Sequence, residues 1–163
     1  MSSYREVFGA MESSGADYVW MGLSAASAHG ATLVSDDFDF FVRPEAEHLD
    51  RARSALRRIG LADTKEGVHS ENLIALGATT SFLDPYGSPV VDLMTEISGP
   101  SFDEVWAKSV LQDVHGSQIR IASLRHILQS KMAANREKDR DAIKRLRMDF
   151  PELVEELLRK PRG

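Results

Sequence analysis

The sequence predicts a mixed α/β domain of the α+β class, in which a sheet flanked by helices leads into a helical C-terminal segment. Apolar runs of strand length, bounded by Gly and Pro, fall in the first three quarters of the 163 residues. From residue 123 onward, apolar residues recur only at helical spacing. No linker-like composition separates the two parts. We therefore expect an α/β core over residues 1–122 and a helical segment over 123–163 that packs on it as a single structural unit.

The elements expected in the first sixty residues follow from apolar spacing and from residues that end helices. Tyr4, Val7 and Met11 recur at the period of a helix, and Gly60 follows the last apolar residue of another helix. We expect, in order, a helix that starts near residue 4 and stops at Gly15, a strand over 18–21, a short Ala-rich helix over 24–29, a strand over 38–42 and a helix over 45–59.

The later elements are marked by turn and capping residues. Asp84 to Gly87 form a turn signal between two apolar runs, and Ser101 with Glu104 forms a capping box that begins a helix. We expect strands over 72–83 and 89–95, a helix over 101–108, a hairpin of strands over 110–114 and 118–121, and helices over 123–134, 136–147 and 151–158.

The composition excludes several kinds of site. The chain has no cysteine, which excludes thiol catalysis, Cys-bound zinc and disulfides. A formal net charge of −5 is unlike that of a general nucleic-acid binder. The first residues lack the basic and apolar regions of a signal peptide, and no apolar run reaches the ~20 residues of a membrane-spanning helix. We expect a cytoplasmic protein with no membrane partner.

Two acidic residues stand at the start of the apolar strand over 38–42. Asp37 and Asp39 are two residues apart, so on a strand they lie on the same face, ~7 Å apart along the backbone. Two carboxylates at this distance repel each other unless a cation compensates their charge. A short D-x-D pattern also fits a polar strand start in water. The large apolar residues that follow favour a metal-binding role.

A third acid, Asp92, is flanked by Val and Leu in the strand expected over 89–95. If that strand pairs beside the strand over 38–42, Asp37, Asp39 and Asp92 form an oxygen-only site that favours Mg²⁺ or Mn²⁺ over zinc. If Asp92 instead faces solvent on an edge strand, the three acids do not converge. The five histidines show no metal-ligand spacing, and the sequence has no Walker A, G-x-S-x-G or G-x-G-x-x-G motif.

Two stretches of the chain carry a resemblance to a known family. Residues 22–30 read Gly-Leu-Ser-Ala-Ala-Ser-Ala-His-Gly and residues 35–39 read Ser-Asp-Asp-Phe-Asp, so a glycine-led helix precedes a D-x-D strand. Residues 131–139 place a Lys on a helix before an Arg-x-Lys-Asp segment. Over about residues 17–147 the chain resembles the nucleotidyltransferase superfamily, which has the DNA polymerase β-like fold. It looks most like the small prokaryotic branch, some of whose members are toxin–antitoxin components.

The resemblance implies a nucleotidyltransferase-like mixed sheet and a metal-dependent reaction. The reaction would move a nucleoside monophosphate from an NTP to an acceptor hydroxyl and release pyrophosphate. The resemblance also implies that Asp37 and Asp39 hold Mg²⁺ or Mn²⁺, and that Asp92 binds the catalytic metal and helps deprotonate the acceptor. The residues that it implies as triphosphate contacts are Gly22, Ser24, Lys131, Arg136 and Lys138.

Two departures from the family's pattern favour an alternative function. Leu23 follows Gly22 where the family has Gly or Ser, and Leu33 stands where an Arg is frequent, and both changes remove phosphate-binding capacity. The alternative is a catalytically silent member that binds a nucleotide or a partner protein, such as a toxin–antitoxin or defence-system component. A third alternative is a structural interaction protein in which Asp92 faces away from Asp37 and Asp39. The sequence leaves the acceptor open among RNA, a protein and a small hydroxyl compound.

Overall fold

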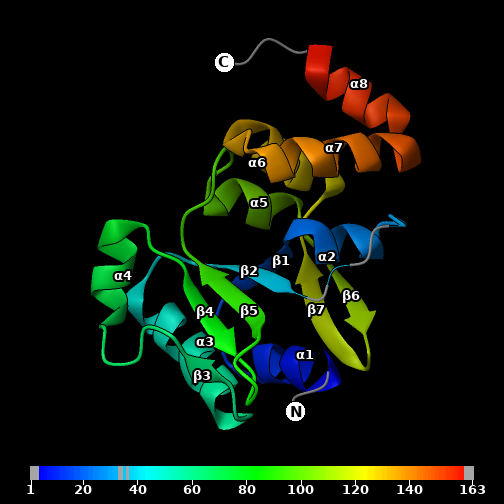
Figure 1. The fold of residues 1–163 in the computed structure, drawn as a ribbon. Coiled ribbons are helices and arrows are strands. Elements are labelled where there is room, and N and C mark those ends of the chain that lie inside the picture. Colours follow the sequence, from blue (N-terminus) through cyan, green and yellow to red (C-terminus); the bar gives the residue numbers. More distant parts are fainter. Residues whose placement is uncertain (1–3, 33–34, 36, 160–163) are drawn as a thin grey trace.

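A mixed seven-stranded sheet forms the centre of the computed structural model, which describes residues 4–32, 35 and 37–159 (Figure 1). The strands are β1 (Tyr18–Met21), β2 (Phe38–Val42), β3 (Ala62–Asp63), β4 (Thr80–Leu83), β5 (Pro89–Met94), β6 (Val110–Val114) and β7 (Ser117–Ile121). Their order is β3-β4-β5-β2-β1-β7-β6. The β2–β5 and β1–β7 pairs are parallel and the other pairs are antiparallel. The predicted mixed α/β class is confirmed.

Helices pack around this sheet. They are α1 (Tyr4–Ser13), α2 (Gly22–Ala28), α3 (Ala46–Arg58), α4 (Ser70–Leu76), α5 (Phe102–Lys108), α6 (Leu124–Ala134), α7 (Glu137–Asp149) and α8 (Pro151–Arg159). In Figure 1, α1 and α3 lie on one side of the molecule and α5, α6 and α7 lie on the other. None of the helices in the described part of the chain has the length and apolar character needed to cross a membrane.

One face of the sheet is aromatic and lies against α1. Side chains alternate along a strand, and Trp20 of β1 is the register partner of Phe40 of β2. Trp20, Phe38 and Phe40 therefore lie on the same face of the sheet. Phe8 of α1 packs edge-on against them, with ring centroids 4.8 Å from Trp20 and 5.2 Å from Phe38. The aromatic face is thus buried, and Asp39, the one polar residue of β2, is left on the opposite face.

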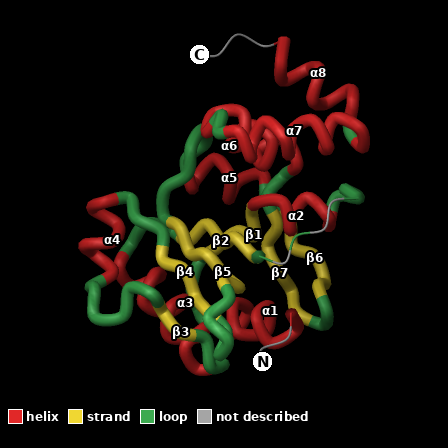
Figure 2. Tube along the Cα trace, viewed as in Figure 1, coloured by secondary structure: helices red, strands yellow, loops and turns green. Residues whose placement is uncertain are grey.

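The C-terminal helices share a second apolar core with α2. Figure 2 shows α6, α7 and α8 gathered away from α1 and α3. The buried members of this core are Ala26, Leu128, Leu146, Val154 and Leu157. Ile127, which precedes Leu128 on α6, instead packs in the main core of the sheet. Helix α6 therefore takes part in both cores. The expected boundary after residue 122 stays a prediction.

The prediction of one strand over residues 72–83 is wrong for the first half of that segment. Residues 70–76 form α4, and only the last four residues of the segment form β4. A short apolar run fits a buried helix as well as a strand, and here Gly77, left-handed at φ 61°, ends a helix. The two-residue β3, which pairs with β4, was not predicted because it is too short to show a period.

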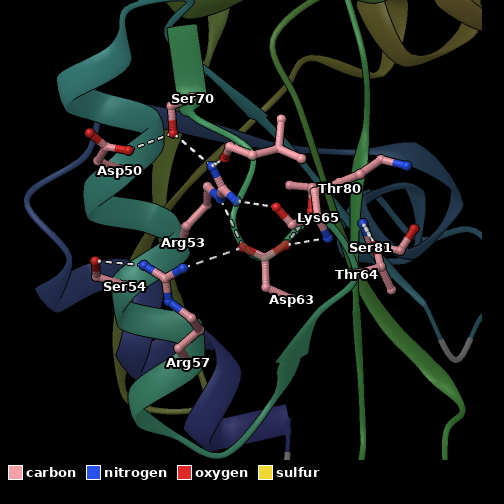
Figure 3. Close-up of polar contacts among 11 residues, drawn as sticks. Asp50, Arg53, Ser54, Arg57, Asp63, Thr64, Lys65, Ser70, Thr80 and Ser81 are labelled. Atoms are coloured by element: carbon pink, nitrogen blue, oxygen red, sulfur yellow. Dashed lines mark hydrogen bonds and ion pairs between the residues drawn. The ribbon is translucent and has the colours of Figure 1, made fainter. Parts of the chain in front are cut away.

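A buried ion pair between Arg53 of α3 and Asp63 of β3 is the centre of a polar network that reaches α4 and β4 (Figure 3). Arg53 Nε donates to Asp63 Oδ2 at 2.8 Å, and both residues are less than a tenth exposed. Arg53 Nη1 also donates to Ser70 Oγ at 3.0 Å, and Thr80 Oγ1 donates to Asp63 Oδ1 at 2.7 Å. Burial alone would raise the pKa of Asp63, but the hydrogen bonds from Thr80, the Lys65 backbone and Arg53 hold it below its ordinary value. This network fixes α3 and the short β3 against β4.

Candidate functional site

The parallel pairing of β2 with β5 places two carboxylates side by side. Asp39 and Asp92 are register partners, both half-buried, on the face of the sheet opposite the aromatic one. Ser81 of the neighbouring β4 donates a hydrogen bond from Oγ to Asp92 Oδ1 at 2.6 Å. Asp37 is exposed and lies just before β2, two residues from Asp39. The purely structural alternative required Asp92 to face away from Asp39. The structure instead places the two residues side by side.

The positive charges near Asp39 do not offset its burial and the negative charge of Asp92. Burial, with the neighbouring charge of Asp92, raises the pKa of Asp39 from an ordinary 3.8 to about 6; Lys131 opposes the rise, Asp37 adds to it and Lys138 opposes it. A carboxylate with so high a pKa carries its negative charge at an energetic disadvantage at neutral pH. A divalent cation would remove that disadvantage.

Gly22 is the residue that lets the backbone come close to Asp39. It has a φ of +76° and begins α2 directly after β1. A Cβ placed on it would overlap the Asp39 carboxylate. Both the left-handed backbone and the closeness of Asp39 therefore require glycine at this position.

A cavity of about 330 Å³ lies beside Asp39. Gly22 and Asp39 line it, and so do Lys131 and Arg136 at the corner between α6 and α7. Burial lowers the pKa of Lys131, while the charges of Asp139 and Asp39 oppose this. The cavity thus combines oxygen ligands suited to a hard cation with two cations suited to phosphate.

The remaining predicted site residues, Asp37 and Asp92 among them, do not line the cavity. Ser24 is 5% exposed and its Oγ accepts a hydrogen bond from the indole Nε1 of Trp20 at 2.8 Å. Lys138 is exposed on α7. Leu23 packs against the second core, so its side chain does not take up space in the cavity. Leu33 lies outside the described residues.

Sequence reasoning did not assign two acids that line the cavity, Glu96 and Asp139. Glu96 continues the alternation of Asp92 and Met94 past the end of β5, which is a period-of-two signal that the sequence does contain. Asp139 stands three residues after Arg136, the spacing of a side chain that caps the start of a helix. Neither signal indicates a cavity by itself.

The residues fit a divalent metal in part. Within residues 4–32, 35 and 37–159, no group of three or more histidine, aspartate or glutamate side chains is arranged to hold a metal ion. Asp39 and Asp92 nevertheless form an adjacent pair of hard oxygen donors. Mg²⁺ is commonly held by one or two carboxylates together with waters and substrate phosphates. The pair therefore fits a metal that a phosphorylated substrate helps to bind.

Comparison with known proteins yields two structural likenesses. No family model matches the chain, and no curated protein matches it. A proposed nucleotidyltransferase from Helicobacter pylori has a TM-score of 0.42 and 16% sequence identity over 78% of this chain and 55% of its own. JHP933 from Helicobacter pylori has a TM-score of 0.43 and 16% identity over 81% of this chain and 58% of its own. This chain thus spans little more than half the length of either structure.

Proposed function

We propose that the chain is a metal-dependent nucleotidyltransferase, which moves a nucleoside monophosphate from an NTP to an acceptor hydroxyl and releases pyrophosphate. The observation that carries this proposal is the pairing of Asp39 with Asp92, together with the cavity that Asp39 lines along with Lys131 and Arg136. Phosphoryl-transfer sites combine these two features, because the substrate is an anion that reacts while bound to a divalent cation.

The acids and the cations have separate roles in this reaction. Asp39 and Asp92 would hold Mg²⁺ or Mn²⁺, with Asp37 as the predicted third ligand. A metal bound there supplies Lewis-acid stabilisation of the charge that develops on the transferring phosphoryl group. Lys131 and Arg136 bind and orient the triphosphate oxygens. Gly22 leaves room for the substrate beside Asp39, and Asp92, which also accepts from Ser81, receives the proton of the acceptor hydroxyl.

Pyrophosphate release tests the proposal. The wild type is incubated with Mg²⁺ or Mn²⁺ and each of the four NTPs, with RNA, protein and small-molecule fractions of a cell extract as acceptor sources. We expect release with at least one NTP from the wild type and from the Asp141→Asn control, which changes an exposed acid on α7. The Asp37→Asn/Asp39→Asn double variant should release none. A wild type that neither releases pyrophosphate nor binds any NTP with metal would refute the proposal.

A second candidate is a silent, regulatory member that binds a nucleotide or a partner protein, as a toxin–antitoxin or defence-system component would. The observation that favours it is the lack of a three-acid group in the described part of the chain. Such a protein binds an NTP with metal but releases no pyrophosphate with any acceptor fraction. The cytoplasm would be the place of either activity.

A further inference from the structure

The corner between α6 and α7 gathers two cations around one buried carboxylate. α6 ends at Ala134, Asn135 is left-handed at φ 50°, and Arg136 caps the start of α7. Asp139, in the first turn of α7, is 1% exposed. Its Oδ2 accepts from Arg136 Nε at 2.7 Å, its Oδ1 accepts from Arg136 Nη2 at 3.2 Å, and Lys131 Nζ lies 3.7 Å from Oδ1.

Asp139 does more than cap a helix. The cap requires only an acceptor for the Arg136 backbone N–H, which Asp139 Oδ2 provides at 3.1 Å, and a neutral side chain would serve as well. Burial alone would raise the pKa of Asp139, but the hydrogen bonds from Arg136 and the charge of Lys131 hold it below its ordinary value. The carboxylate is therefore kept as an anion that two cations share.

The shared carboxylate of Asp139 fixes the positions of the Lys131 and Arg136 side chains. Lys131 and Arg136 repel each other and have long, flexible side chains, and Arg136 is more than half exposed. Held by one carboxylate, both remain at the cavity wall before any ligand binds. Groups fixed in this way bind an anion without first being ordered, which strengthens binding.

We propose that Asp139 is a positioning residue that holds Lys131 and Arg136 together at the cavity wall, so that both contact the same bound polyphosphate. The inference rests on the proposed function, because it assigns Asp139 a part in binding the triphosphate. Asp139 itself does not contact the ligand. Its removal would weaken binding even though it removes a negative charge from the neighbourhood of an anion.

Calorimetric titration with inorganic tripolyphosphate and Mg²⁺ tests this inference. Wild type, Asp139→Asn, Asp139→Glu and Arg136→Gln are compared with Asp141→Asn, which changes an exposed acid on the same helix. We expect Asp139→Asn to weaken binding on the order of 10-fold, the usual effect of removing a supporting partner of a binding residue. Asn can still accept from the Arg136 backbone N–H, so α7 should remain capped, and thermal unfolding checks this. Asp141→Asn should bind like the wild type.

A double-variant comparison separates positioning from general damage to the fold. In an Arg136→Gln background, Asp139→Asn should weaken binding by a smaller factor, because one of its two partners is already absent. An equal loss in both backgrounds, or unchanged or tighter binding by Asp139→Asn, would overturn the inference.

If Asp139→Asn does not fold, Asp139→Glu decides. It keeps the charge and the cap but displaces the carboxylate, so wild-type affinity would overturn the inference and weaker binding would support it. A wild type that does not bind tripolyphosphate refutes the proposed function and this inference with it.

Discussion

Replacing Asp39 by Asn should stabilise the metal-free protein at neutral and alkaline pH. The pKa of Asp39 is raised from 3.8 to about 6 by burial and by Asp92, with a smaller contribution from Asp37. Between these two values the folded chain binds more protons than the unfolded chain, so the free energy of unfolding falls as pH rises. At about 1.4 kcal/mol for each pKa unit, the full penalty above pH ~6 is about 3 kcal/mol, which is an upper limit because Asn is also polar.

Urea unfolding in EDTA at a series of pH values measures this effect. We expect Asp39→Asn to be more stable than the wild type by about 1–3 kcal/mol at pH 8, with the difference shrinking as pH falls from 6 towards 3.8. Asp141→Asn, an exposed control, should show no such difference. Adding Mg²⁺ at pH 8 should stabilise the wild type and leave Asp39→Asn unchanged. A variant that is less stable than the wild type at pH 8, or whose gain does not change with pH, would contradict the reasoning.

Two further predictions concern stability. Asp63→Ala leaves Arg53 buried without its carboxylate, so it should cost about 3–5 kcal/mol by urea unfolding at pH 7. Because the pKa of Asp63 is lowered in the folded state, the stabilisation is fully present above its ordinary pKa and is lost as pH falls through the folded value. An equal cost at pH 7 and at pH 2 would contradict this. Gly22→Ala should cost more than about 1 kcal/mol, since Ala is strained at φ +76° and would overlap Asp39. The variant should also lose NTP binding measured by calorimetry, whereas Gly30→Ala, where a Cβ meets nothing within 4 Å, should keep it.

The sequence predicts best where a local pattern is long enough to be unambiguous. Helices α6 and α7 follow from apolar spacing over ten or more residues, and β2 follows from an apolar run that is closed by Pro44. The run from Leu73 to Leu76 is too short for such a distinction, which is why α4 was predicted as a strand. His29, one of the five histidines without metal-ligand spacing, has its Nε2 2.8 Å from the Ala122 carbonyl oxygen.

By itself the sequence determined which acids are candidates for a metal, and it predicted that Asp37 and Asp39 share a face, since alternation along a strand is local. Only the tertiary structure decided that β5 pairs in parallel with β2 and brings Asp92 beside Asp39, because strand pairing depends on the packing of the whole sheet. It also decided that Leu23 packs into the second core and that Asp139 lies between Lys131 and Arg136. These positions depend on how α2, α6 and α7 meet, and no spacing along the chain contains that information.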